Sequence, residues 1–173
     1  MGAVTLEYAA SSNLTVTNLH SLAASSGLLA GWTSGTIDNT SDKHEDKQVT
    51  AKFITAAANN QVGSIQVWVY TMLDDSNWPD VFSSGTEGSE GAATIHDDEQ
   101  KAEAFKLLWS GTTDAGASEP HNMPWSSIAA LFGGVMPSKC AIFVTGNATT
   151  TTTAQFAASG NQVTVKGVYR SVA

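Results

Sequence analysis

Hydrophobic and polar residues alternate along several short stretches of the chain, as they do in strands that bury one face. The clearest stretch is Ser64–Tyr70, whose aliphatic residues face one way while Gln66, Trp68 and Tyr70 face the other. The next clearest is Asn161–Tyr169, where two valines alternate with Thr164 and Lys166. We predict a core strand with an aromatic outer face for the first stretch and the last strand of the fold for the second.

Weaker alternation extends the set to about eight strands. The weaker candidates are Val4–Tyr8, Leu14–Asn18, Leu28–Ile37, Val49–Thr55, Ala104–Trp109 and Cys140–Thr145. Parallel strands need crossover helices, and almost no helical periodicity is long enough to supply them. The pattern therefore predicts an all-β fold: one antiparallel, jelly-roll-like β-sandwich over residues 1–173, with one or two short helices.

Two stretches favour short helices. Asp97–Glu99 suits the first turn of a helix, and the residues from Ala102 to Trp109 fit helix and strand equally well. Pro124–Gly134 resembles one or two helical turns, with proline near the start and glycine past the end. We expect this second helix to close one end of the sandwich.

Three other stretches predict loops. Asp74–Ala93 and Gly111–Met123 are rich in Gly, Ser, Asp and Glu. Loops of this length inside a compact domain are usually either functional or disordered, so these are the places where a partner could be met. The run Thr149–Thr153 predicts a hairpin arm or its loop.

Charge narrows the choice of partner. The chain has 14% charged residues, a net charge of -8 and an isoelectric point near 4.7. Such a chain is repelled by phosphate backbones and anionic membranes, so we expect neither nucleic acid nor membrane as a partner. Neither a secretory signal nor a membrane span is indicated, which predicts a protein made in the cytosol.

The sequence contains no recognisable catalytic motif. Cys140 is the only cysteine, and we expect it to be a buried apolar residue. Ser41–Lys47, which includes His44, alternates in charge and predicts a solvated loop. His96–Glu99 lacks the spacing of a calcium loop. We therefore predict no catalytic residue, no cofactor and no metal, while a pair of glycosidase carboxylates depends on the fold and stays open.

The chain has five tryptophans, which could pack in the core or contact a partner. Core packing is favoured for three of them, and Trp32 and Trp78 remain candidate partner contacts. Trp78 is followed closely by Asp80, and an aromatic ring beside carboxylates can stack on a sugar. We predict Trp32, Trp78 and Asp80 as possible partner-contact residues.

Strings along nearly the whole chain resemble small virion structural proteins of tailed bacteriophages. These strings are Ser21–Ser26, Ala30–Trp32, Ile37–Ser41, Ile65–Tyr70, Ile128–Gly134, Met136–Pro137, Phe143–Thr145 and Val168–Tyr169. The resemblance implies a head decoration or cement protein: a homo-oligomer on the outer surface of the head, with the major capsid protein and copies of itself as partners. A tail or baseplate component and a carbohydrate-binding module are the alternatives.

Overall fold

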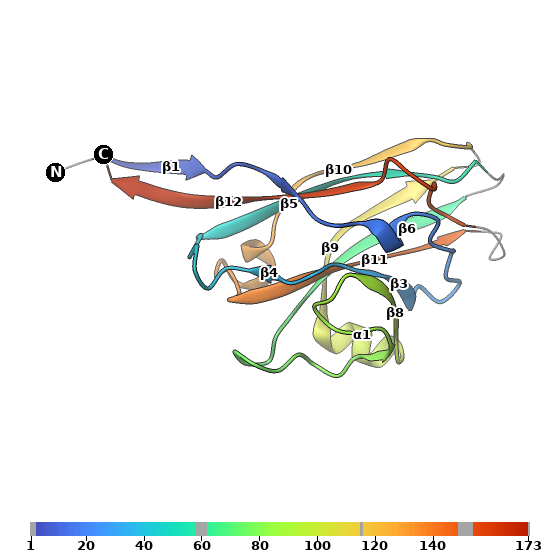
Figure 1. The fold of residues 1–173 in the computed structure, drawn as a ribbon, viewed down its shortest axis with the longest axis horizontal. Coiled ribbons are helices and arrows are strands. Elements are labelled where there is room, and N and C mark those ends of the chain that lie inside the picture. Colours follow the sequence, from blue (N-terminus) through green and yellow to red (C-terminus); the bar gives the residue numbers. More distant parts are fainter. Residues whose placement is uncertain (1–2, 58–61, 115, 149–153, 173) are drawn as a thin grey trace.

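The computed structural model describes residues 3–57, 62–114, 116–148 and 154–172. Within these ranges, twelve strands form two antiparallel sheets, which confirms the predicted all-β sandwich (Figure 1). The strand count exceeds the expected eight because several strands are short or lie in stretches that the pattern assigned to loops. Among the described residues, no helix has the length and apolar character needed to span a membrane.

The first sheet has five strands, in the order β1-β12-β5-β10 with β2 beside β12. Their bounds are β1 Val4–Tyr8, β2 Ser12–Asn13, β5 Asp46–Ile54, β10 Pro120–Ser127 and β12 Gln162–Val172. The second sheet has seven strands, in the order β7-β8-β3-β11-β6-β9 with β4 beside β11. Their bounds are β3 Ala30–Thr33, β4 Ile37–Asp38, β6 Gly63–Thr71, β7 Phe82–Ser84, β8 Gly91–Ile95, β9 Phe105–Thr113 and β11 Lys139–Ala148.

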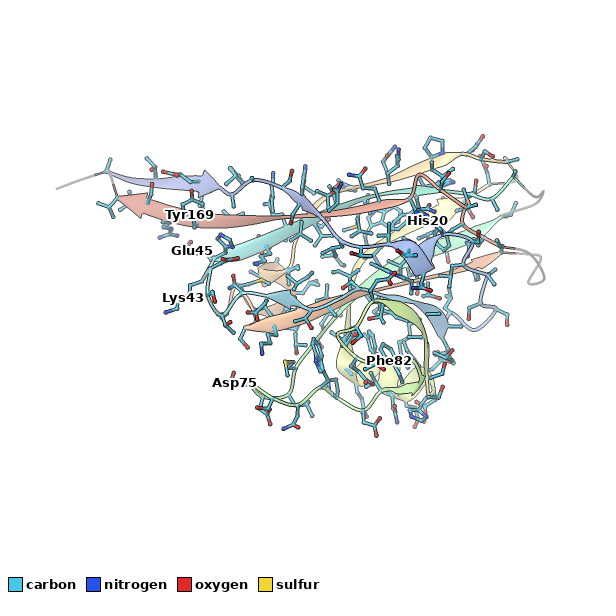
Figure 2. The ribbon with its side chains drawn as sticks, viewed as in Figure 1. His20, Lys43, Glu45, Asp75, Phe82 and Tyr169 are labelled. Atoms are coloured by element: carbon cyan, nitrogen blue, oxygen red, sulfur yellow. The ribbon has the colours of Figure 1, made fainter. Side chains whose placement is uncertain are left out.

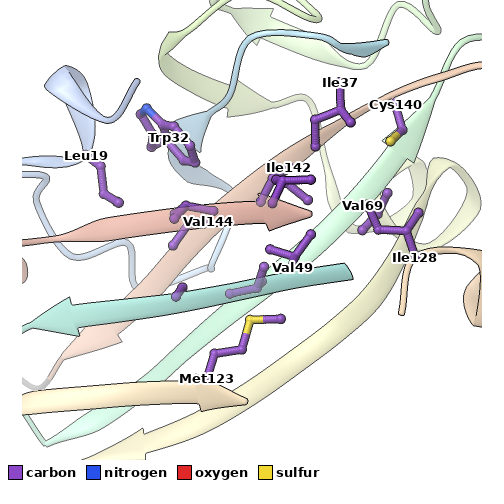
Figure 3. Close-up of a cluster of buried hydrophobic side chains, with 14 of the residues drawn as sticks. Leu19, Trp32, Ile37, Val49, Val69, Met123, Ile128, Cys140, Ile142 and Val144 are labelled. Carbon is purple, nitrogen blue, oxygen red and sulfur yellow. The ribbon is translucent and has the colours of Figure 1, made fainter. Parts of the chain in front are cut away.

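The main core lies between the two sheets (Figure 3). The aliphatic side of β6 contributes Val67 and Val69, which stand opposite Val144 and Ile142 of β11 in the ladder. Val49 of β5 faces them from the other sheet, and all five side chains are fully buried. The alternation seen in the sequence thus places one face of each central strand in a shared core.

A second core covers the other face of the seven-stranded sheet. Phe82 of β7 lies 5.6 Å from Tyr70 and 5.8 Å from Phe143, measured between ring centroids. It also lies 6.2 Å from Phe105 of β9, although β7 and β9 are at opposite ends of the strand order. The sheet therefore curls round this cluster and covers the aromatic outer face predicted for β6, where Tyr70 is fully buried and Trp68 is half-buried.

The predicted loop 74–93 belongs to this second layer. It contains β7 and the start of β8, and Val81 and Phe82 within it are buried against the sheet. The short helix α1, Asp98–Ala104, follows. Asp97 caps it by accepting a hydrogen bond from the Gln100 N–H, and β9 begins at the next residue, Phe105. The stretch that fitted helix and strand equally well is therefore a helix up to Ala104 and a strand from Phe105.

Two other sequence predictions were wrong. Leu14–Asn18 is not a strand: only Ser12–Asn13 pair with β12, and the chain then turns through the 3-10 helix η1, Thr17–Leu19. The predicted loop 111–123 is shorter than expected, because β9 of the seven-stranded sheet continues to Thr113 and β10 of the five-stranded sheet starts at Pro120. Its polar residues face solvent from strands, where they look like loop residues in the sequence.

The predicted helix at Pro124–Gly134 is only partly present. Its first residues belong to β10, and the 3-10 helix η2 covers Ala129–Phe132 before Gly133 ends it with a φ of 70°. Ile128 and Ala129 are buried in the main core, so this turn does help to close the sandwich. The threonine run 149–153 lies outside the described residues.

Candidate interaction surface

An exposed apolar stripe runs along two strands that extend beyond the rest of the molecule, at the left of Figure 1. Here β1 pairs only with the end of β12, in a register that sets Val4 opposite Val172 and Tyr8 opposite Val168. We call residues 4–8 and 168–172 the arm. Val4, Leu6 and Tyr8 alternate onto one face and are 61%, 57% and 55% exposed, and Val172 is 73% exposed. Large apolar side chains gathered in this way mark contact surfaces.

Polar side chains on the other face of the arm tie its two strands together. Glu7 accepts a hydrogen bond from the Tyr169 hydroxyl at 3.1 Å and another from the Ser171 hydroxyl. Hydrogen bonds from Ser171 and Tyr169 hold the pKa of Glu7 below its ordinary value, and the same carboxylate raises the pKa of Tyr169. Side-chain hydrogen bonds thus join the two strands of the arm and fix the orientation of its apolar face.

The apolar stripe continues onto the outer face of the five-stranded sheet. The Lys166 ammonium lies between two rings, 4.6 Å from the centroid of Tyr8 and 4.1 Å from that of Trp125, which is 43% exposed. The charged residues of β5, β10 and the paired part of β12, apart from a histidine, are Asp46, Lys47, Lys52 and Lys166. Lys47 is buried and the Asp46 carboxylate accepts from the Ala129 N–H, which leaves Lys52 and Lys166 as the charges free on this face. This face can therefore be covered with little loss of charge hydration.

Residues 72–104, which we call the acidic segment, contrast sharply with this face. The segment holds nine of the sixteen acidic residues and one of the eight basic residues, so its net charge is -8. The rest of the chain holds seven of each sign and is neutral. The segment covers the outer side of the seven-stranded sheet, away from the five-stranded sheet, and Figure 2 shows Asp75 and Tyr169 on opposite sides of the molecule.

The acidic segment is anchored by a few inward-facing groups. The Glu90 carboxylate accepts from the Trp32 indole at 2.8 Å and from both the backbone and the amide of Asn18. Burial opposes ionisation of Glu90, but these hydrogen bonds outweigh it and lower the pKa. Lys101, the segment's only cation, is buried and donates to the Leu28 carbonyl at 2.7 Å. Seven carboxylates remain exposed: Asp74, Asp75, Asp80, Asp97, Asp98, Glu99 and Glu103.

The three contact residues predicted from the sequence do not form one site. Trp32 is fully buried in the main core, so its ring offers no surface to a partner. Trp78 is half-buried and packs on Tyr70, with 5.3 Å between ring centroids. Asp80 is exposed in the same segment, beside a hollow lined by Leu73. The exposed tryptophan is Trp125, which the sequence reading assigned to the core.

The charged run Ser41–Lys47 is less solvated than predicted. Lys47 is buried and donates to the Asp38 carbonyl at 2.7 Å and to Asp42 at 3.2 Å. His44 is half-buried, with its Nδ1 3.7 Å from Asp42 and its ring 5.7 Å from that of Tyr169. The last two residues of this run begin β5, and Glu45 pairs with Arg170 of the arm.

Within the described ranges, no three His, Cys, Asp or Glu side chains gather in a way that could hold a metal ion. Cys140 is fully buried, and this burial raises the pKa of its thiol to about 12. Comparisons with protein-family models, with curated proteins and with solved structures found no match to this chain.

Proposed function

We propose that this protein is a structural component of a tailed-phage virion, a decoration protein without enzymatic activity that lies on the outside of the head. The observation that carries the proposal is the separation of charge: the whole net charge of -8 belongs to residues 72–104, on the side opposite the five-stranded sheet. The outer face of the five-stranded sheet meets the shell protein, and the acidic segment points to solvent.

Desolvation favours this orientation. A surface that is covered on binding loses its water, and charged groups lose the most hydration free energy. The outer face of the five-stranded sheet has few charges, and Lys166 there already lies between two aromatic rings. Trp125 and Tyr8 add the kind of aromatic area that is enriched in protein interfaces. Weak contacts of this type become strong when many copies bind one shell.

The acidic segment supports an exterior position. Seven exposed carboxylates in one segment repel packaged DNA, whereas on the outside they keep particles apart. A protein that binds the assembled shell and not its separated subunits also shifts the equilibrium toward the shell. The sequence resemblance to small virion proteins supports the same class.

Particles without this protein give the test. Heads lacking it should rupture at lower temperature or lower salt than complete heads, and purified protein added back should restore them. Lys52→Glu places a carboxylate on the outer face of the five-stranded sheet and should abolish this rescue. Lys106→Glu makes the same change at an exposed lysine of β9 in the other sheet and should rescue fully.

Two results would contradict the proposal. If heads without the protein were as robust as complete ones, it would have no cementing role. If microscopy of labelled particles found it only on the tail, the tail or baseplate alternative would replace the head assignment.

A further inference from the structure

The edges of the two sheets differ in how they are protected against pairing with another strand. Exposed edges are usually blocked by proline, charge, bulges or short length. The edge strand β10 carries Pro120, Pro124 and a register shift after Met123. The edge strand β7 has three residues and a register shift, and β9 has a shift opposite Val67/Trp68.

The one charged side chain of strand β1, Glu7, is held within the arm by hydrogen bonds from Tyr169 and Ser171, and the strand has no other protection of this kind. Its five residues pair with β12 without a register shift and include neither proline nor lysine. The other side of the arm, residues 169–172 of β12, carries the charged Arg170, which pairs with Glu45 at 3.1 Å. Among the described edge strands longer than two residues, β1 is the one open to strand addition.

The backbone of β1 presents free hydrogen-bonding groups at this edge. The Ala9 N–H donates to the carbonyl of Gly167, the next pair in the β1/β12 register. In an antiparallel ladder, hydrogen-bonded pairs alternate with non-bonded pairs. Thr5 and Glu7 therefore bond to β12, and Val4, Leu6 and Tyr8 direct their N–H and C=O groups outward.

The sequence of β1 is complementary to itself when two copies run antiparallel about Leu6. Leu6 then faces Leu6 of the second copy, and Val4 faces Tyr8, with each pair exchanging both backbone hydrogen bonds. Thr5 faces Glu7, so the two carboxylates are not opposite each other, and each stays bonded to Tyr169 of its own arm. The exposed apolar side chains of both arms lie on one face of the joined sheet.

We propose that β1 pairs with β1 of a second copy of this chain, antiparallel and centred on Leu6, so that the two five-stranded sheets become continuous across a two-fold axis. The pairing satisfies the free backbone groups of the arm and brings its apolar side chains together. It goes beyond the proposed function because its basis is the arm alone, and it can be tested with purified protein in the absence of particles.

Cross-linking tests the register. Hydrogen-bonded antiparallel pairs have Cα atoms about 5.5 Å apart, within the range of a disulfide. Leu6→Cys should therefore form a disulfide dimer under mild oxidation. Val4→Cys is the matched control on the same face, because its two copies would be about 13 Å apart along the strands. Cys140 is buried in both variants and should not react.

Oligomeric state in solution gives a second, independent measurement. Light scattering should find a dimer for the natural chain. The variant Leu6→Lys should be a monomer with unchanged circular dichroism, because a dimer would bring two ammonium groups together at the two-fold axis. Leu107→Lys, at an exposed leucine of β9, should stay dimeric. A natural chain that is monomeric or trimeric at about 100 µM, or equal cross-linking of the two cysteine variants, would overturn the proposal. Loss of head binding alone would leave it standing.

Discussion

The two sheets of this molecule share the same alternation of apolar and polar residues but differ in how many of their faces are buried. The seven-stranded sheet is buried on both faces, between the main core and the aromatic cluster of Tyr70, Phe82, Phe105 and Phe143. The five-stranded sheet is buried on one face, and its outer side continues into the exposed stripe of the arm. Burial on both faces stabilises the seven-stranded sheet, while burial on one face leaves the five-stranded sheet with an exposed outer face.

Charge follows the same division. The acidic segment that covers the seven-stranded sheet has a net charge of -8, and the remainder of the chain is neutral. A sheet covered by its own chain can display charge without hindering assembly, whereas an assembly face is best left uncharged. The contrast between the sheets can therefore be tested by comparing the cost of changes on each.

The largest effect is expected where the seven-stranded sheet is buried on its outer side. Phe143→Ala leaves a cavity against Phe82 and Phe105 and should lower the free energy of unfolding by about 3–5 kcal/mol. Val172→Ala, at the 73% exposed tip of the arm, should change it by less than about 0.5 kcal/mol. Denaturant unfolding of both variants checks this. An equal loss of unfolding free energy in the two variants would contradict the difference in burial between the two sheets.

A smaller effect is expected at the buried hydroxyl of Tyr70. Its oxygen lies 2.7 Å from the Thr33 hydroxyl and accepts from the Gly88 N–H at 2.9 Å. Tyr70→Phe removes the acceptor of the Gly88 N–H and the shorter of the two hydrogen bonds of the Thr33 hydroxyl, and it should cost about 1–3 kcal/mol at neutral pH. Tyr8→Phe is the control, because its ring is 55% exposed on the arm and the change should have almost no effect on stability.

The same residue sets a pH dependence. Burial raises the pKa of Tyr70 to about 12, above its value near 10 in the unfolded chain. As the pH rises, the hydroxyl loses its proton in the unfolded chain before it does so in the folded one. The contribution of Tyr70 to the free energy of unfolding is therefore fully present below pH 10 and falls between pH 10 and 12. The advantage of the natural chain over Tyr70→Phe should shrink across that window, by on the order of 2 kcal/mol. A constant difference between them would contradict the assignment.

The smallest effect is expected at the anchor between the acidic segment and η1. Glu90→Gln weakens the bonds from Trp32 and Asn18 and should cost about 1–2 kcal/mol near pH 7. Because the pKa of Glu90 is lowered in the fold, the carboxylate stabilises the protein above its ordinary pKa and loses this effect as the pH falls. The natural chain and the variant should therefore converge in acid. Thermal unfolding at several pH values measures both.

Local pattern was enough to find the strands that bury at least one apolar side. The two faces of Ser64–Tyr70 and the inward valines Val163 and Val165 were predicted correctly. The edge strand β10 was divided between a predicted loop and a predicted helix, because its edge position tolerates Pro120 and Pro124 and most of its side chains are not buried. Alternation reports burial, and a strand with little burial leaves no such signal.

The candidate surface was harder to predict, because exposure depends on contacts far apart in the chain. Trp32 can be buried because its indole N–H donates to the carboxylate of Glu90, which lies 58 residues further along the chain. No local sequence pattern contains that pairing. Trp125 is exposed because the bulge in β10 displaces it from the ladder. Val4–Tyr8 was recognised as a strand, but its own five residues do not reveal that it is left uncovered by the rest of the fold.

The turn at Asp74–Asn77 suggests a use in epitope display. Asp74 accepts from the backbone N–H groups of Ser76 and Asn77 and from the Asn77 amide, so the turn is closed by its own hydrogen bonds. Its residues are exposed in the acidic segment, far from the arm. Exposed, self-contained turns are the preferred sites for inserted sequence. If the protein coats a head as proposed, a peptide grafted beside this turn would be carried on the solvent side of every copy, and the particle would become a multivalent antigen.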